Sequence, residues 1–446
     1  MKNIKIAIWA IPVVLTALWS IANFPLPQTL GFIAIRNLVV QYSGVLSMGA
    51  MSVAMILATR ARWLESWVNG LDKSYRLHKW LGISALVTSI VHWIAAQGPK
   101  WMVGLGLMEA PQRGPRPAGA PDLGAVQAFF TSQRELAEGV GEWAFYAAVL
   151  LIALALIKRF PYRLFASTHT LIAIAYLALV AHGVVLLNFE SWPQPLGIVM
   201  APLMAGGVVS AVLALSRQIG RGNRVAGKIK TIKTFAELNA TAVGIALEEG
   251  WAGHAAGQFA FVTFDPKEGT HPFTIASAWD PASREVLFIS KGLGDYTDVL
   301  PKTLAVGGEA TVEGPYGRFT FDDGQGRQIW IGGGVGITPF IARMKHLAKM
   351  PGSKPVDLIH STKEVSAEAL DLLKADAAAA GIRLHVLIDG RDGFLSGERL
   401  RKLVPSWKAA SVWFCGPAAF GQALRGDLLA SGLAADQFHQ ELFNMR

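Results

Sequence analysis

Two apolar stretches decide the fold of this chain: residues 77–93 read LHKWLGISALVTSIVHW, and residues 169–182 read HTLIAIAYLALVAH. His78 and His92 are fourteen residues apart in the first, and His169 and His182 are thirteen apart in the second. At a rise of about 1.5 Å per residue, each pair separates its imidazoles by roughly 20 Å along a helix. At about 100° per residue, His92 returns to within roughly 40° of His78, whereas His182 lies about 140° around from His169. A bulge, a tilt or binding from different flanks must absorb that second offset.

Long apolar segments fill the first half of the chain. The sequence of 446 residues is 52% hydrophobic, which is too apolar for a protein that is soluble throughout. Six runs are long enough to cross a bilayer and predict six transmembrane helices: Ile4–Ala22, Leu38–Ala58, Leu77–Ala96, Trp143–Ile157, Phe165–Leu187 and Leu196–Leu215. The first run also fits a cleavable signal peptide, but we expect an uncleaved span because no clear small-x-small site precedes Asn23.

Lys and Arg are concentrated on one side of these helices. Segments 59–79, 158–163 and 216–233 are rich in them, whereas 188–195 carries only an acid and 98–139 offsets its basic residues with acids. By the positive-inside rule, the basic segments and both termini face the cytosol, in a bacterial-type inner membrane. This asymmetry accounts for the net charge of +9. We expect no nucleic-acid partner, because no soluble face interleaves basic and aromatic residues.

The four histidines then fall at two depths. The third and fifth helices both run outward, so His78 and His169 lie at their cytosolic ends, and His92 and His182 lie nearer the outer side. Ionisable groups inside a bilayer are costly and usually functional, and neutral imidazole is a common haem-iron ligand. We predict two b-type haems, one held by His78 with His169 and one by His92 with His182. The alternatives are interfacial or hydrogen-bonded histidines, or a proton relay, which would not require matched depths.

Two more polar side chains lie in these helices. Tyr176 is midway between the fifth-helix histidines, where core packing is favoured over a role in filling space between the haems. Arg36 is at the outer end of the second helix and fits a haem-propionate partner and an ordinary interfacial arginine equally well.

After residue 217 the pattern changes to short alternating segments separated by Gly, Pro and Asp. Residues 219–324 predict the strands of an antiparallel β-barrel, for example at 285–290 and 310–313. Residues 325–446 alternate strand-like and helical runs, which predicts a doubly wound α/β domain. The expected fold is thus multi-domain: a six-helix transmembrane haem bundle over 1–218, then the barrel, then the α/β domain.

Two motifs in the predicted barrel suit a flavin. His271-Pro272-Phe273-Thr274, followed by Ser277, places an aromatic ring and a hydroxyl on opposite faces of a strand, although such a run alone is more often core than cofactor site. The second motif, Lys291-Gly292-Leu293-Gly294-Asp295-Tyr296-Thr297, supplies a cation and backbone amides for a diphosphate.

The sharpest motif of the second half is IGGGVGITPF at residues 331–340. It follows an apolar strand and opens a helix, so its glycines permit close backbone approach and the helix start attracts a pyrophosphate; the residues concerned are Gly332, Gly333, Gly334, Gly336, Thr338 and Pro339. One strand later, Ser361-Thr362-Lys363 stands where a ribose 2′-phosphate would be read, which favours NADPH over NADH; the alternative is a solvated loop.

Cys415-Gly416-Pro417 closes the last strand. As the one cysteine of the chain, Cys415 excludes an internal disulfide. A buried cysteine is usually inert packing, but the Gly-Pro behind it indicates a strand end held against the nicotinamide.

Together these residues resemble the ferric reductase and NADPH oxidase superfamily, in which a six-helix, two-haem membrane domain is fused to a ferredoxin-NADP-reductase-like module. The matching features are YRLHKWLG at 75–82, the two histidine spacings, HPFT, GGGVGITPF and CGP. The resemblance implies FAD contacts from His271, Phe273, Thr274, Lys291, Tyr296 and Thr297, and nicotinamide-nucleotide contacts from Gly334, Gly336, Thr338, Cys415 and Gly416. It assigns Thr274, Cys415 and Phe443 to the reacting centre, with Phe443 shielding the flavin. Three residues follow Phe443 here, and His271 stands where many soluble reductases have arginine.

The resemblance implies a transmembrane oxidoreductase with FAD, two haems b and NADPH or NADH as cofactors. Electrons would pass from the nucleotide through FAD and the inner and outer haems to an extracytoplasmic acceptor, either oxygen, giving superoxide, or ferric or cupric chelates. The alternative is an electron-transfer subunit that reduces a periplasmic partner protein or exchanges electrons with quinone. A haem sensor or channel is disfavoured because it has no use for a nucleotide module. The sequence leaves the oligomeric state undecided.

Overall fold

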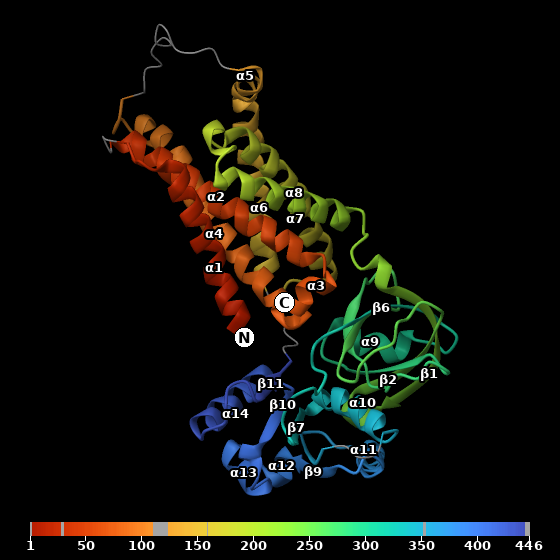
Figure 1. Ribbon diagram of the computed structural model, residues 1–446. Coiled ribbons are helices and arrows are strands. Elements are labelled where there is room, and N and C mark those ends of the chain that lie inside the picture. The colour runs from red at the N-terminus through yellow and green to blue at the C-terminus, as the bar shows by residue number, and fades with distance from the viewer. Residues whose placement is uncertain (1, 28–30, 110–123, 158, 351–353, 442–446) are drawn as a thin grey trace. The chain divides into compact units, whose positions relative to one another are not determined.

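The chain folds into two compact units, one of Met1–Val68 with Lys73–Ile219 and one of Asn69–Asp72 with Gly220–Met445. The computed structural model describes residues 2–27, 31–109, 124–157, 159–350 and 354–441 (Figure 1). The first unit is built of helices and the second is built around two sheets.

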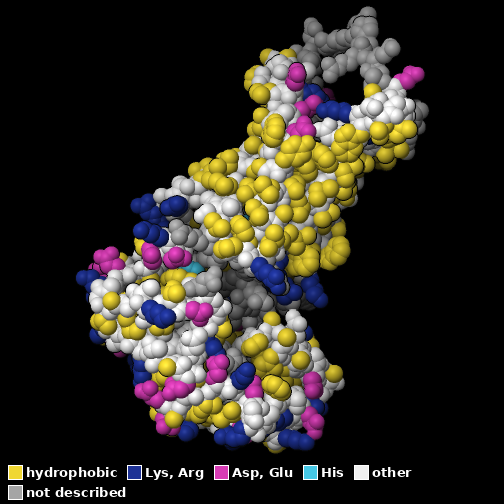
Figure 2. Space-filling view, turned by 180° about the vertical axis from the view of Figure 1, so that it is seen from behind, with side chains coloured by type: hydrophobic (Ala, Val, Ile, Leu, Met, Phe, Trp, Pro, Cys, Tyr) yellow, Lys and Arg dark blue, Asp and Glu magenta, His cyan; other side chains and the backbone are white. Residues whose placement is uncertain are grey.

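Six helices of the first unit are long and apolar enough to cross a membrane, as the sequence predicts. They are α1 (Lys2–Asn23), α2 (Phe32–Ala58), α4 (Leu71–Gly104), α6 (Arg134–Leu156), α7 (Tyr162–Leu186) and α8 (Pro195–Leu215), joined in places by the short helices α3 (Arg62–Val68) and α5 (Ala125–Ser132). Hydrophobic side chains cover much of the bundle surface (Figure 2), and Trp9 and Trp143 are 72% and 77% exposed. Such a surface suits contact with lipid. The chain is a multi-pass membrane protein.

Small and hydroxyl-bearing residues hold the helices close together in the centre of the bundle, as is common in membranes. Ser47 of α2 donates to the Ala85 carbonyl of α4 at 3.2 Å. Tyr176 of α7 is 1% exposed, and its hydroxyl lies 2.8 Å from that of Ser52 on α2. Tyr176 therefore belongs to the packed core, which is the role the sequence favoured.

Arg36 of α2 supports the proline in α4. Pro99 has no N–H, so the carbonyl of Ala95, four residues earlier, loses its helical donor. Arg36 Nε donates to the Ala95 carbonyl at 3.0 Å, and a terminal nitrogen donates to the Ala96 carbonyl at 3.0 Å. This contact explains how α4 continues to Gly104, past its predicted end at Ala96. It also occupies N–H groups of Arg36 that would be needed to bind a haem propionate.

The first sheet of the second unit is antiparallel. Its strands are β1 (Arg224–Phe235), β2 (Ala240–Leu247), β3 (Phe259–Thr263), β4 (His271–Thr274), β5 (Glu285–Lys291) and β6 (Glu309–Tyr316), in the order β4-β3-β6-β1-β2-β5, and helix α9 (Asp295–Thr303) follows β5. Just beyond β4, Ile275 forms an isolated bridge with Phe288 of β5. The edge strands therefore meet at a bridge and not along a ladder, so the expected barrel is a curved sheet without continuous closure.

The second sheet is parallel and confirms the doubly wound prediction. Strands β7 (Arg327–Gly333), β8 (Val356–Thr362), β9 (Arg383–Ile388), β10 (Ala410–Cys415) and β11 (Phe438–Gln440) lie in the order β11-β10-β7-β8-β9. Helices α10 (Thr338–Leu347) and α11 (Ala367–Ala379) share one apolar core with the sheet; α13 (Gly397–Leu403) and α14 (Ala418–Ala430) share another, and α12 (Asp389–Asp392) follows β9. The chain runs outward from β7 to β9 and then returns to β10, so the strand order reverses between β7 and β10.

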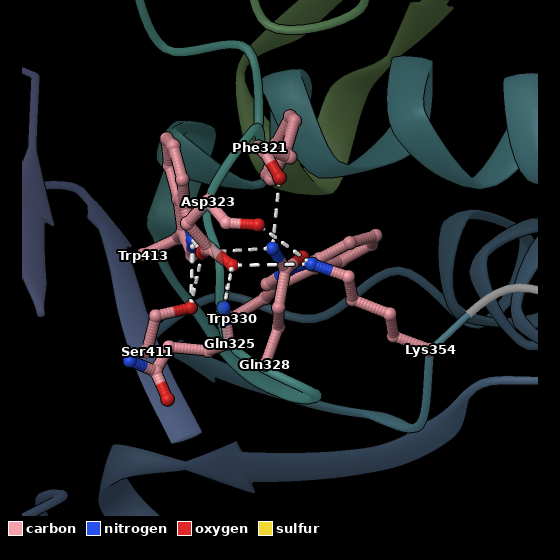
Figure 3. Close-up of polar contacts among 8 residues, drawn as sticks. All are labelled: Phe321, Asp323, Gln325, Gln328, Trp330, Lys354, Ser411 and Trp413. Atoms are coloured by element: carbon pink, nitrogen blue, oxygen red, sulfur yellow. Dashed lines mark hydrogen bonds and ion pairs between the residues drawn. The ribbon is translucent and has the colours of Figure 1, made fainter. Parts of the chain in front are cut away.

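The carboxylate of Asp323, with a side chain that is 9% exposed, fixes the segment that joins the two sheets (Figure 3). Asp323 accepts hydrogen bonds from Ser411 Oγ, from Trp413 Nε1 at 2.9 Å and from Gln328 Nε2 at 3.0 Å. Burial raises the pKa of Asp323, but these and neighbouring hydrogen bonds outweigh burial and hold the pKa below its usual value. The connector is thereby tied to β7 and β10.

Candidate cofactor-binding sites

The four membrane histidines meet in two pairs, and these are the pairs expected from their depths. The ring centroids of His78 and His169 are 5.8 Å apart, and those of His92 and His182 are 6.1 Å apart. Two imidazoles bound to opposite sides of one metal ion, through nitrogen–metal bonds of about 2 Å, place their ring centres about 6 Å apart. The spacing of both pairs fits bis-histidine ligation of haem iron.

Backbone carbonyls fix the protonation of three of these rings. The Nδ1 atoms of His78, His92 and His182 donate to the carbonyls of Ala54 at 2.8 Å, Val40 at 2.9 Å and Ala137 at 2.8 Å, respectively. A proton held on Nδ1 leaves the lone pair on Nε2, which is the tautomer that a metal ligand needs. The donor chemistry therefore fits haem at both depths.

Glycines on the flanking helices make room for the rings of His92 and His182. Gly141 of α6 lies one turn after Ala137, and a Cβ there would overlap the His182 ring. Gly44 of α2 lies one turn after Val40, and a Cβ there would be 3.3 Å from the His92 ring. A carbonyl followed four residues later by glycine thus forms a slot for each ring.

The slot on α6 also resolves the thirteen-residue spacing on α7. His182 faces His92 of α4 and also bonds to Ala137 of α6, and His169 faces His78 of α4. Helix α7 is a continuous α-helix from Tyr162 to Leu186. Its two histidines therefore leave on different flanks, and no bulge is needed.

The first flavin motif places its residues in two environments. His271, on β4, stacks on Tyr296 of α9 with ring centroids 3.9 Å apart and ring planes 13° apart. Thr274 is 8% exposed, and Phe273 packs within the sheet core near Phe288. Ser277 Oγ accepts a hydrogen bond from the Leu287 amide at 3.0 Å. Phe273 and Ser277 thus serve packing and backbone support here, which leaves the His271–Tyr296 stack as the aromatic surface of the motif.

The stacked rings are both neutral over the physiological pH range. Burial lowers the pKa of His271 to about 4. Burial, together with the carboxylates of Glu268 and Asp265, raises the pKa of Tyr296 to about 12. His271 therefore cannot attract a phosphate by charge, and a planar apolar group is the natural neighbour for this pair.

The second flavin motif forms the loop before α9. Thr297 Oγ1 accepts from the Leu293 amide at 2.9 Å, and Gly292 N donates to the Asn239 carbonyl at 2.8 Å. The first-turn amides of α9 have no acceptor within the helix, so this end suits an anion. Lys291, predicted as the cation of the site, forms an ion pair with Glu364.

The glycine-rich motif lies where the strand order reverses between β7 and β10, the position at which open α/β sheets bind nucleotides. Gly332 pairs with Cys415 across these strands. A Cβ at Gly336 would overlap the Cys415 carbonyl, and a Cβ at Gly333 would lie 3.0 Å from Pro417. Gly334 has φ +56, a conformation that favours glycine. The structure thus brings the GGGVG and CGP motifs together at one sheet edge.

Other residues of this edge support the backbone. Thr338 Oγ1 donates to the Val335 carbonyl at 2.7 Å, and Pro339 begins the buried face of α10. Cys415 is fully buried, and burial, with the carboxylate of Glu441, raises the pKa of its thiol well above the usual value. Its role is therefore that of a neutral thiol at a strand end. Phe443 lies outside the described residues.

An acidic residue that the sequence did not reveal lies beside the predicted ribose site. Ser361, at the end of β8, donates from Oγ to Asp389 Oδ1 at 3.2 Å, while Lys363 is exposed. The parallel register, which pairs Ser361 with Leu387, brings Asp389 to this edge. A carboxylate suits the ribose 2′-hydroxyl of NADH, and Lys363 suits the 2′-phosphate of NADPH.

Comparison with known proteins agrees with this two-part organisation. Residues 43–180 match the family described as ferric reductase like transmembrane component. Similar curated proteins include a flavohemoprotein of Oceanobacillus iheyensis, 26% identical over 162 residues that cover 34% of this chain and 40% of the relative. The reductase component of propane 2-monooxygenase of Mycolicibacterium goodii is 26% identical over 217 residues, which cover 44% of this chain and 61% of that protein. The chain thus spans less than two thirds of either relative.

Solved structures show weaker likeness. A flavohemoglobin of Malassezia yamatoensis is 15% identical with a TM-score of 0.48, covering 92% of this chain and 98% of that one. The ferredoxin reductase in carbazole 1,9a-dioxygenase is 18% identical with a TM-score of 0.42, covering 49% and 69%. Likeness at these scores carries no conclusion about this chain.

The class of protein follows from the bundle, the two sheets and the family match. The chain joins a membrane-spanning helical bundle to a two-sheet unit that is similar to FAD/NAD-binding reductase modules. Residues 43–180 match the family described as ferric reductase like transmembrane component.

Proposed function

We propose that the protein is a transmembrane oxidoreductase that takes electrons from cytosolic NAD(P)H and delivers them, through FAD and two b-type haems, to an extracytoplasmic acceptor. Oxygen, giving superoxide, and ferric or cupric chelates are the acceptors to test. The observation that carries the proposal is the presence of two histidine pairs in the bundle. The two ring centroids lie 5.8 Å apart within one pair and 6.1 Å apart within the other. The same chain also contains the nucleotide motif. The module and both termini would face the cytosol of an inner membrane.

The bundle residues would hold and orient the haems. His78 with His169 would hold the inner haem, and His92 with His182 would hold the outer one. When bound, FAD accepts a hydride and releases single electrons, which haem iron carries one at a time. The carbonyls of Val40 and Ala137 keep the Nε2 lone pairs of the outer rings available. Because two histidines would hold each haem, an acceptor would be reduced without binding to the iron.

The module residues would position two planar cofactors. The neutral His271–Tyr296 stack offers an apolar surface to the flavin, and the first-turn amides of α9 suit its diphosphate. The glycines between β7 and α10 would let the nicotinamide nucleotide approach the backbone beside Cys415. Ser361, Lys363 and Asp389 would read the ribose, and Thr274 would lie near the reacting ring edge, with Phe443 covering the flavin.

An anaerobic absorption spectrum of the purified full-length protein with FAD tests the proposal. Addition of NADPH or NADH should reduce the flavin and then the haem bands, because one chain holds the whole path. His169→Ala should abolish reduction of one haem, whereas His346→Ala, in α10 of the module, should leave both. Flavin reduction without haem reduction would contradict the proposed transfer from FAD to haem. Purified protein that contains no haem would contradict the proposed function as a whole.

The acceptor is tested by comparing superoxide formation with ferric-chelate reduction under air and argon. A protein that turns over rapidly with one acceptor and not the other assigns the reaction. Slow turnover with every small acceptor would favour the electron-transfer subunit instead.

An apolar groove supports quinone exchange as the second candidate. The groove of about 1040 Å³ lies between α6 and α7 and is lined by residues that include Trp143, Leu171, Ile174 and Ala178. By helical spacing, Leu171, Ala178 and His182 share one stripe of α7, so the groove leads toward the outer histidines. Haem-dependent reduction of a short-chain quinone, lost in Ala178→Trp, would establish this alternative; equal rates in the two proteins would reject it.

A further inference from the structure

The four predicted haem ligands differ in the support that their second ring nitrogen receives. In the outer pair, both Nδ1 atoms donate to carbonyls, His92 to Val40 and His182 to Ala137. In the inner pair, His78 donates to Ala54 at 2.8 Å. His169 Nδ1 is buried and has no hydrogen-bond partner in the part of the chain that the structure describes. Its ring stacks instead on Phe165, with centroids 5.0 Å apart and planes 21° apart.

This difference in hydrogen bonding is larger than the difference in ring geometry. The ring planes cross at 68° in the inner pair and 80° in the outer pair, and the centroid separations differ by 0.3 Å (6.1 minus 5.8). Both pairs are made of the same ligand type. The orientation of the imidazoles therefore does not separate the two sites, whereas the missing acceptor at His169 does.

A hydrogen bond from Nδ1 makes the imidazole a stronger donor to the metal. A stronger donor stabilises ferric iron more than ferrous iron and so lowers the reduction potential; second-shell hydrogen bonding is one of the protein's ways to set that potential. The outer site has two strengthened ligands and the inner site has one. Resting on the proposed function, we propose that the inner haem has the higher reduction potential of the two, with His169 and Phe165 as the residues that set the difference.

Charged side chains of both signs lie on the helices near each site. At the inner end, Arg76 and Lys79 flank His78 on α4, and the carboxylates of Asp72 on α4 and Glu65 on α3 are buried. At the outer end, Arg36 lies one turn from Val40, and Arg134 forms an ion pair with Glu138 at 2.9 Å. The proposed order therefore rests on the difference in hydrogen bonding.

The order has a consequence for the reaction. The first electron from the flavin would settle on the inner iron, on the cytosolic side. Its passage outward would oxidise the inner iron from ferrous to ferric and reduce the outer iron from ferric to ferrous, against the potential difference. The extracytoplasmic acceptor would then take the electron from the outer iron. The protein would thus hold an electron inside until an acceptor is present.

A potentiometric titration of the full-length protein with both haems bound tests this inference, with Phe165→Gln and Phe165→Met as matched variants. Phe165 is four residues before His169, so a Gln there can offer its side-chain oxygen to Nδ1, whereas Met has the same length and no such acceptor. We expect two reduction steps in the wild type. Gln should shift the higher-potential step to more negative potential and leave the lower one, and Met should shift neither step in that direction.

Ligand variants provide the second measurement, in case Phe165→Gln does not fold. His169→Ala should lose the higher-potential step and His182→Ala the lower one. A single reduction step, a Gln effect on the lower step, or the opposite assignment from the ligand variants would overturn the inference while leaving the proposed function intact. Absence of haem from the wild-type protein would overturn the proposed function itself.

Discussion

Gly141 is the position at which one added carbon atom tests the proposed outer haem site most directly. In Gly141→Ala, the new Cβ would overlap the His182 ring. In Gly44→Ala, it would lie 3.3 Å from the His92 ring, and in Gly139→Ala, on the same helix as Gly141, it would meet nothing within 4 Å. The three substitutions thus form a graded series with an internal control.

The expected size of the effect follows from two terms. Overpacking a fitted site costs about 1–3 kcal/mol, and displacing His182 also loses its hydrogen bond to Ala137, worth about 0.5–1.5 kcal/mol. The sum, about 1.5–4.5 kcal/mol, corresponds to a roughly ten- to two-thousand-fold loss of affinity for the outer haem. Gly139→Ala should instead stabilise α6 slightly, by about 1 kcal/mol, through helix propensity.

Haem content per protein, with the absorption spectrum of the reduced protein, measures the outcome. Gly141→Ala should fall from two haems toward one, Gly44→Ala should lie between, and Gly139→Ala should retain both. Size-exclusion chromatography checks that each variant is folded. Two haems with unchanged midpoint potentials in Gly141→Ala, or equal losses in Gly139→Ala, would refute the slot as the basis of the site.

Four shorter predictions concern the second unit. Gly336→Ala should weaken NAD(P)H binding at least roughly tenfold, by fluorescence titration, because the added Cβ overlaps a strand-end carbonyl. Lys363→Ala should raise the KM for NADPH roughly tenfold and leave that for NADH unchanged; equal effects would remove the NADPH preference. Asp323→Asn should lower the free energy of unfolding at pH 7 by about 2–4 kcal/mol in denaturant titrations of the full chain. Because the folded pKa of Asp323 is lowered, its stabilisation is present above the unfolded pKa of about 3.9 and lost as pH falls through the folded value, so the deficit of the variant should shrink in acid. FAD affinity should not change between about pH 6 and pH 10 through His271 or Tyr296, whose pKa values are about 4 and about 12; a fluorescence-monitored transition that His271→Asn removes would contradict this.

The fold could be predicted because apolar run length and strand alternation are properties of the sequence itself. The ends of the helices could not. Helix α6 begins at Arg134, nine residues before the predicted Trp143, because its first turns contain Glu138, Gly139 and Gly141, which interrupt the apolar run. One of them, Gly141, lies against the His182 ring, so a residue that hid the helix start belongs to the site.

The site could be predicted in outline only. The membrane topology predicted that the histidines lie at two depths. The carbonyls that fix their tautomers could not be predicted, because every residue has a backbone carbonyl and no side chain marks these three. Lys291 and Ser277 had the right chemistry for a cofactor, yet the structure engages them with Glu364 and the Leu287 amide. Asp389 lies beside Ser361, at the predicted ribose site, because of the register between β8 and β9, and no local sequence motif encodes that register.

The opposed flanks of His169 and His182 make α7 resist rotation about its own axis. With side chains about 140° apart around the helix, a turn that moved His182 toward His92 would swing His169 away from His78. Neither ligand pair can be tightened by twisting α7 without loosening the other. We therefore expect both histidine pairs to hold α7 against rotation, so that a change in the alignment of one pair alters the alignment of the other.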